Sequence, residues 1–373
     1  MSGLDRTHVA PPALDVVRAL FVSEFEEGAR AADASDEIPP EDLARFHALG
    51  LCALTVPPEF GGLGLAPPEV VPYLERAGMG PAWGRMLAHV ANGIWRPIVR
   101  YGSEEQQSVV ARMAAGEALV AFALTERSGG SGRDLHSRAR RDGDGWRLSG
   151  EKHLITFADR ADAFLLTAAS DDRRAADSLT SFLLPRGTPG LQVEETQHTM
   201  GLAGTGHRTL RFDDMAVEDR HRLGPVGHGL EVAMCFLDYS RVSLSSCMVG
   251  TAQRALDEAV AFARERVTFG RPIAERQAIQ VHLADMHAEV AAGRALVRQS
   301  AEAPTGAASA TAKLFCQRMV GRVTDLALRV HGGIGYTTAS PIERLYRDAR
   351  GYWFEEGTAE IQQLVIARDL LGR

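Results

Sequence analysis

The spacing of hydrophobic and polar residues divides the chain into three regions. From about residue 12 to 116, alanine-rich segments with helical spacing are separated by pairs of prolines, a pattern that predicts four or five helices. Residues 119–224 instead carry short apolar runs between polar turns, which is typical of β-strands. After residue 229, apolar side chains recur at intervals of three, four and seven, as in 279–297. This periodicity predicts long helices that pack in a bundle.

Five apolar runs in the central region are expected to be strands, because each is short and bounded by turn residues. They are WRLSG at 146–150, AFLLTA at 163–168, SFLLP at 181–185, LQVEE at 191–195 and TLRF at 209–212. The segment DGDG at 142–145 is a hairpin signal just before the first of them. We therefore expect an α+β fold that is mainly α, with a helical domain over 1–118, a β domain over 119–226 and a helical bundle over 227–373.

Composition and charge narrow the class of protein. The chain has 373 residues, of which 45% are hydrophobic and 24% charged, with a formal net charge of −7; these values fit a soluble globular protein of two or three domains. Mild acidity without a basic block argues against nucleic acid or an anionic membrane as a partner. The four cysteines form no C-x-x-C pair, so we expect neither a disulfide framework nor a metal site. No signal-like or long apolar segment is visible, and we expect a cytoplasmic protein.

Three segments carry residue types that suit a planar or phosphorylated ligand. The small residues of LTERSGGSGRDL at 124–135 allow backbone N–H groups to approach a ligand closely. The segment HLIT at 153–156 offers a second edge with a threonine hydroxyl. Arg266, Thr268 and Phe269 place a cation, a hydroxyl and a ring at the end of a predicted helix, which suits a pyrophosphate beside a ring. The alternative for Arg266 is a terminal cation that offsets the helix dipole.

Five sequence blocks resemble the acyl-CoA dehydrogenase family. They are VPPEFGGLGL at 56–65, ALTE at 123–126, GEKHLIT at 150–156, RVTFGRPIAERQAIQ at 266–280 and HGGIGYTTASPIERLYRDARGYWFEEGTAEIQQLVIARDLL at 331–371. The resemblance implies an N-terminal helical domain, a middle β-barrel-like domain and a C-terminal four-helix bundle that together bind FAD. It also implies α,β-desaturation of an acyl thioester, in which a base removes the α-proton and the β-hydrogen leaves as hydride to flavin N5.

The resemblance assigns the catalytic base to Glu356, which precedes Gly357 and Thr358. A carboxylate can remove a weakly acidic α-proton when partial desolvation raises its basicity. On local sequence alone, Glu356 is also explained as an acid at the start of the helix that follows, where the helix dipole favours it. Some relatives carry the base on an earlier helix, at the position that is Ser240 here. Glu356 is therefore the base that the pattern offers.

The resemblance also assigns contacts to the cofactor and the substrate. Some of the FAD contacts are expected to reach the cofactor of a neighbouring subunit, namely those of Arg266, Thr268, Gln277 and the loop 329–333. The expected FAD-binding residues are Phe122, Leu124, Thr125, Ser131, Leu154, Thr156, Arg266, Thr268, Phe269, Gln277, Arg329, Gly332, Gly333, Thr358 and Glu360. The expected substrate-binding residues are Ser131, Asp238, Arg241, Glu355 and Gly357. The alternative for Arg241 is an ion pair with a nearby acid.

Several residues depart from the family pattern. Leu154 stands where an aromatic side chain is usual, Arg127 replaces a proline and Arg329 replaces a glutamine. Glu355 replaces the tyrosine that ordinarily precedes the base, and a second carboxylate there would either raise the apparent pKa of the pair or contact a polar acyl group. These departures favour a specialised acyl-CoA as the substrate.

The expected partners follow from the same resemblance. They are an electron-transfer flavoprotein as the acceptor and further copies of the chain in a tetramer or dimer. The alternatives are an acyl-ACP dehydrogenase of secondary metabolism, as in polyketide extender-unit formation, an acyl-CoA oxidase that uses oxygen, and a flavin- or carrier-binding scaffold without turnover.

Overall fold

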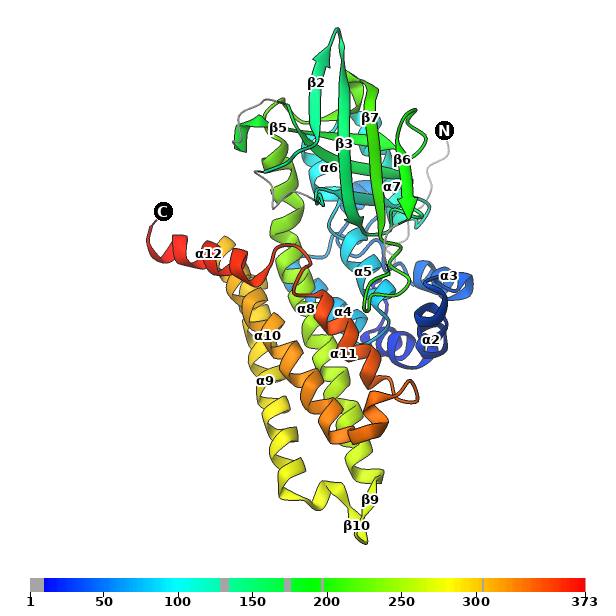
Figure 1. The fold of residues 1–373 in the computed structure, drawn as a ribbon, viewed down its shortest axis with the longest axis vertical. Coiled ribbons are helices and arrows are strands. Elements are labelled where there is room, and N and C mark those ends of the chain that lie inside the picture. Colours follow the sequence, from blue (N-terminus) through cyan, green and yellow to red (C-terminus); the bar gives the residue numbers. More distant parts are fainter. Residues whose placement is uncertain (1–9, 128–133, 171–175, 196–197, 304, 373) are drawn as a thin grey trace.

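A computed structural model describes residues 10–127, 134–170, 176–195, 198–303 and 305–372. Figure 1 shows a sheet at one end of the molecule, long helices that extend to the other end, and the N-terminal helices packed along one side. The expected fold class is confirmed, because helical, sheet and helical parts follow one another along the chain.

The N-terminal part consists of short helices. In the described residues these are α1 Leu14–Ala19, α2 Glu26–Ser35, α3 Pro40–Ala48, α4 Pro67–Gly78, α5 Ala82–Ala91, α6 Trp95–Tyr101 and α7 Glu104–Ala114, with a π-helical turn at Leu20–Glu24. The prediction of four or five helices was too low, because α1 and α6 have only six and seven residues and show too little periodicity to be recognised. Pro40 and Pro67 begin α3 and α4, where the fixed φ of proline suits the first turn.

The middle part is one eight-stranded sheet with the strand order β6-β7-β3-β2-β4-β5-β8, and β1 pairs in parallel with β4. The strands are β1 Val120–Ala123, β2 Arg138–Asp142, β3 Gly145–Ile155, β4 Ala163–Ala169, β5 Leu179–Pro185, β6 Gln192–Glu195, β7 Arg208–Glu218 and β8 Arg222–Leu223. All five expected strands are present. Strands β2 and β3 pair antiparallel up to Asp142 and Gly145, so DGDG forms the expected hairpin turn.

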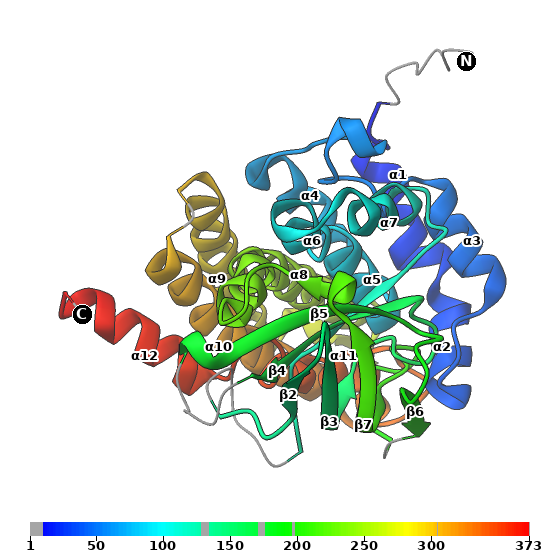
Figure 2. The same ribbon diagram turned by 90° about the horizontal axis from the view of Figure 1, so that it is seen from above.

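Long helices form the C-terminal part. They are α8 Gly229–Glu265, α9 Gln277–Glu302, α10 Gly306–His331, α11 Ile342–Gly351 and α12 Ala359–Leu370, with a small hairpin of β9 Val267–Thr268 and β10 Arg271–Pro272. At 37 residues, α8 is about 55 Å long and runs from the sheet to the hairpin, whereas α12 projects sideways (Figures 1 and 2). None of the described helices has the length and apolar character needed to cross a membrane.

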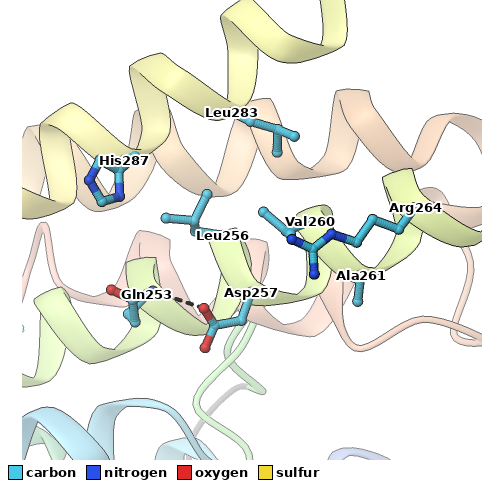
Figure 3. A pocket seen from close by; sticks show the side chains of 8 residues that line it. All are labelled: Gln253, Leu256, Asp257, Val260, Ala261, Arg264, Leu283 and His287. Carbon is cyan, nitrogen blue, oxygen red and sulfur yellow. Dashed lines mark hydrogen bonds between the residues drawn. The ribbon is translucent and has the colours of Figure 1, made fainter. Parts of the chain in front are cut away.

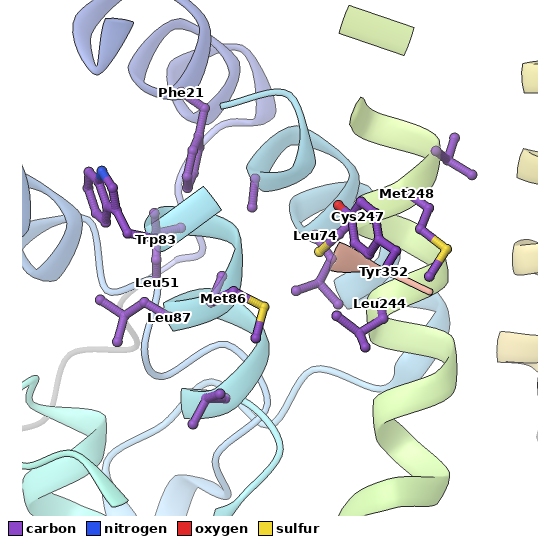
Figure 4. Close-up of a cluster of buried hydrophobic side chains, with 14 of the residues drawn as sticks. Phe21, Leu51, Leu74, Trp83, Met86, Leu87, Leu244, Cys247, Met248 and Tyr352 are labelled. Atoms are coloured by element: carbon purple, nitrogen blue, oxygen red, sulfur yellow. The ribbon is translucent and has the colours of Figure 1, made fainter. Parts of the chain in front are cut away.

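One hydrophobic core joins the N-terminal helices to α8 (Figure 4). Trp83 and Met86 of α5 and Leu244 and Met248 of α8 are all buried in it. The backbones of α4 and α8 touch, since a Cβ atom added to Gly250 would lie 1.8 Å from the carbonyl oxygen of Glu75. Because α5 and α8 share this core, polar side chains on their facing sides are also held in place.

Candidate active site

The loop between α11 and α12 carries Glu356. Its backbone is left-handed, with φ of 50° at Glu356 and 94° at Gly357, a conformation that is uncommon for a residue with a side chain. The buried Lys313 of α10 holds this loop, because its ammonium group donates hydrogen bonds to the carbonyl oxygens of Glu355, Glu356 (2.9 Å) and Gly357 (2.7 Å). Three donors on one small cation match three carbonyl groups that converge on one point.

The Glu356 side chain points into a polar patch between α5 and α8. Its Oε1 lies 3.6 Å from His89 Nε2, and the carboxyl side chain is only 15% exposed. The other ring nitrogen of His89 lies 2.9 Å from Ser243 Oγ, and Ser240 Oγ lies 3.4 Å from His89 Nε2. His89, Ser240 and Ser243 are buried. Glu356 thus has the partly desolvated setting that a general base requires.

The neighbouring Glu355 forms an ion pair with Arg85 of α5. The guanidinium group donates two hydrogen bonds to the carboxylate, of 3.2 and 3.0 Å, and it also stacks over the Tyr352 ring at 4.0 Å. Arg85 is buried and Glu355 nearly so. The charge of Glu355 is therefore neutralised by Arg85. The two residues are 270 positions apart in the chain, and the sequence did not reveal this pairing.

The only two lysines of the chain both lie inside it. Lys152 pairs with the buried Glu126 at 2.7 Å and donates to the Leu124 carbonyl oxygen, while Lys313 holds the Glu356 loop. Burial lowers the pKa of each ammonium group to about 8. The signal was present in the composition, since only two of 41 basic residues are lysines. Their scarcity now indicates positions where an arginine does not fit.

The residues predicted for FAD in the β part lie together. The His153 N–H donates to the Thr125 carbonyl oxygen at 2.8 Å, so the segment after β1 lies against the end of β3. Leu154 is 43% exposed with φ of 55°, and Thr156 Oγ1 lies 3.3 Å from His207 Nε2. Threonine hydroxyls beside an exposed leucine fit a ring with polar edges and an apolar face. Phe122 packs edge-on against Phe236 of α8, and Ser131 lies outside the described residues.

A second group of predicted FAD residues lies at the far end of the bundle. Arg266, Thr268 and Phe269 belong to the hairpin after α8, and Phe269 is 97% exposed. The rings of Phe262 and His331 stack at 4.4 Å, which brings the ends of α8 and α10 together. The remaining members are Gln277, Arg329, Gly332 and Gly333, all exposed. Because the sheet lies at the opposite end (Figure 1), one chain does not bring the two groups together.

The other predicted residues lie beside Glu356 or on α8. Thr358 is the N-cap residue of α12, and its hydroxyl lowers the pKa of Glu360 by a hydrogen bond. On α8, the buried Arg241 donates to the 59% exposed Asp238 at 2.8 Å. The pairing considered for Arg241 is therefore present.

A separate pocket of about 380 Å³ lies between α8 and α9, lined in part by Gln253, Asp257, Arg264 and His287 (Figure 3). Gln253 is 13 residues beyond Ser240 on α8, a distance of about 20 Å along the helix, so this pocket is no part of the Glu356 site. In the described parts of the chain, no three histidine, cysteine or acidic side chains gather as metal ligands.

Comparisons with known proteins agree with this architecture. Models of the N-terminal, middle and C-terminal domains of acyl-CoA dehydrogenases match residues 13–117, 121–215 and 227–371. Human mitochondrial short-chain specific acyl-CoA dehydrogenase is 36% identical over 366 residues, covering 96% of this chain and 89% of its own.

Solved structures show the same likeness. Butyryl-CoA dehydrogenase from Megasphaera elsdenii has a TM-score of 0.91 at 28% identity and covers 96% of this chain and 97% of its own. A glutaryl-CoA dehydrogenase from Mycobacterium smegmatis in complex with FADH2 has a TM-score of 0.90 at 26% identity, with coverages of 96% and 94%. The chain belongs to the acyl-CoA dehydrogenase family, a family of oxidoreductases that act on CH–CH groups.

Proposed function

We propose that this protein is an FAD-dependent acyl-thioester dehydrogenase in which Glu356 removes the α-proton. The observation that carries this proposal is the geometry of the base. Lys313 holds the Glu356 loop, and the carboxylate points into the buried patch between α5 and α8. Membership of the family and the FADH2 complex of the Mycobacterium smegmatis relative support FAD as the cofactor.

In this mechanism the residues of the chain bind, orient and accept a proton. Bound FAD would supply the acceptor for the β-hydride. Thr125, Leu154 and Thr156 would hold its ring system at the end of β3, against which the segment that carries Thr125 lies. Glu356 takes the α-proton on its carboxylate, and its low exposure keeps bulk water from competing for that proton.

Anaerobic titration of the purified yellow protein with acyl thioesters tests the proposal. We expect the flavin absorbance to bleach within one turnover and an electron-transfer flavoprotein to reoxidise the flavin. A panel on both CoA and acyl carrier protein identifies the carrier, and the yield of peroxide in air separates a dehydrogenase from an oxidase. Flavin that stays oxidised with every thioester on either carrier would overturn the proposed activity.

We also propose that each FAD is shared between two copies of the chain, because the two groups of FAD residues lie at opposite ends of one chain (Figure 1). Changing Arg266→Gln together with Phe269→Ala is expected to abolish FAD retention without altering the chain's own base. Co-expression of this double variant with Glu356→Gln should restore activity, since one site of each hybrid pair then holds an intact base and an intact hairpin.

Random pairing at equal expression should restore about a quarter of the wild-type activity, because about half of the pairs are hybrids and each has one intact site. The measurement is flavin reduction by the mixed preparation against each variant alone. A mixture no more active than its parents, or a double variant that retains full FAD, contradicts sharing of the cofactor.

Lys313→Met is expected to slow flavin reduction about 10²-fold, because three carbonyl groups lose a charged donor and the base loop loses its position. Lys313→Arg should rescue little, since a planar guanidinium does not direct its donors to one point. The rate of anaerobic bleaching measures the effect. Arg318→Met, which removes an exposed cation from the same helix, is the matched control and should leave the rate unchanged.

A further inference from the structure

The groups that surround the Glu356 carboxylate are polar, which fits the specialised acyl group that the departures from the family pattern favour. Building on the proposed function, we propose that the acyl group of the substrate is short and carries a neutral hydrogen-bonding group, such as a hydroxyl, on the carbon next to the reacting Cα–Cβ bond. His89 and Ser240 would bind that group, and the Arg85–Glu355 ion pair would close the acyl end of the site.

His89 lies close to the place where the reacting carbons of the substrate would bind. Its Nε2 lies 3.6 Å from Glu356 Oε1, and a carbon whose proton the base removes must lie about 3–3.5 Å from the same carboxylate. The α-carbon and the imidazole would thus both contact the Glu356 carboxylate, so a polar group on the carbon beyond the reacting bond can reach His89. Ser240 Oγ, at 3.4 Å from the same ring nitrogen, borders the same space.

The hydrogen-bonding state of His89 favours a hydroxyl as the occupant. Its Nδ1 is engaged with Ser243 Oγ at 2.9 Å, so Nε2 is the nitrogen that faces the base and Ser240. A hydroxyl both donates and accepts, and so it matches Nε2 in either tautomer as well as the serine hydroxyl. A methylene group in the same place would keep water from these buried polar atoms and replace none of their hydrogen bonds.

The buried end of the site limits the length of the acyl group. On α8, Asp238 is exposed, whereas Ser240, Ser243 and Cys247 are buried, so the carrier would enter beside Asp238 and the acyl group would point inward. Arg85 lies four residues from His89, about 6 Å along α5, and forms its bidentate pair with Glu355 there. A chain longer than a few carbons would meet this ion pair.

The charge of the closing pair selects against an acidic acyl group. Glu355 already occupies both terminal nitrogens of Arg85, so the pair has no net charge to offer a substrate carboxylate. The carboxylate of Glu356 stands beside it and would repel a second anion. Neutral polar acyl groups are thus favoured over both long hydrocarbons and dicarboxylic acyl groups.

Four probes on CoA test this selection: 4-hydroxybutyryl, pentanoyl, succinyl and octanoyl thioesters. The first two have equal numbers of non-hydrogen atoms and differ in a hydroxyl against a methyl group. We expect the rate constant of anaerobic flavin reduction divided by the dissociation constant to be at least tenfold higher for 4-hydroxybutyryl-CoA than for pentanoyl-CoA, and octanoyl-CoA and succinyl-CoA to be poorer still.

Variants connect the preference to the named side chains. His89→Leu should reduce the hydroxyl-to-methyl preference to about one, whereas His89→Gln and Ser240→Ala should each retain part of it. His287→Leu, an exposed histidine on α9, is the matched control and should keep the full preference. The ratio is measured within each variant, so a general loss of activity does not imitate the effect.

The outcomes separate this inference from the proposed function. If pentanoyl-CoA, octanoyl-CoA or succinyl-CoA bleaches the flavin as efficiently as 4-hydroxybutyryl-CoA, the dehydrogenase activity stands and the inference is wrong. A preference that survives in His89→Leu also overturns the assignment to His89. If none of the four probes, and no thioester of the wider panel, bleaches the flavin, the proposed function itself fails.

Discussion

Replacing Glu356 with glutamine is expected to lower the rate of flavin reduction by acyl thioesters about 10³- to 10⁴-fold, while FAD stays bound. The glutamine side chain keeps the size of the carboxyl group but has no basic oxygen to accept the α-proton, and loss of a positioned general base typically costs this much. The loop itself should persist, because Lys313 bonds to backbone carbonyl oxygens and not to the carboxylate.

Two measurements check this expectation. Stopped-flow bleaching gives the rate of hydride transfer, and exchange of the α-hydrogen with deuterated solvent reports proton removal by itself. Glu302→Gln, at the exposed end of α9, is the matched control for loss of one surface carboxylate. If Glu356→Gln turns over at the wild-type rate, the base lies elsewhere and the mechanism above is wrong.

Glu355→Leu is expected to destabilise the protein by about 3–5 kcal/mol, because it leaves the buried guanidinium of Arg85 without its counter-ion. The double variant Arg85→Met/Glu355→Leu should recover most of this loss, since removal of both charges leaves nothing buried and unpaired. A coupling free energy of about 2–3 kcal/mol between the two positions is expected from the double-mutant cycle.

Urea unfolding of the FAD-loaded enzyme, followed by flavin release and by circular dichroism, measures these differences. Arg322→Met provides the comparison, because it breaks the more exposed Arg322–Glu289 pair, for which about 0–1 kcal/mol is expected. If Glu355→Leu and the double variant lose the same free energy of unfolding, the buried Arg85 does not require Glu355 as a counter-ion and the expectation is wrong.

The order of helices and strands was largely predictable from periodicity, and the exceptions have physical causes. The five runs recognised as strands contain apolar side chains that face a core, and such side chains are what a hydrophobic pattern detects. Strand β2 escaped prediction because its sequence, RARRD, has one buried residue, Ala139, among charged ones. Its pairing with β3 depends on the turn and the register, which a local hydrophobic pattern does not contain.

Only those parts of the candidate site that lie close together in the sequence were predictable. Glu356 stood out through the block around it, but His89 and Arg85 lie in an alanine-rich helix far away in the sequence. They became visible only in the folded chain, where His89 lies beside Glu356 and Arg85 pairs with Glu355. In the same way, the segments around Arg266 and Thr156 were both predicted to bind FAD. The sequence did not show that the 37-residue helix α8 holds them at opposite ends of one chain.

The burial of both lysines bears on the chemical durability of the enzyme. Acyl thioesters acylate free amines without a catalyst, and lysine side chains are the usual targets on proteins. Here neither lysine is on the surface, and each ammonium nitrogen is hydrogen-bonded inside the fold. The surface cations are arginines, whose guanidinium groups remain protonated and are not nucleophilic at neutral pH. The surface of the described chain therefore offers no lysine amine to acyl thioesters, and we expect both lysines to remain unacylated during long exposure to substrate.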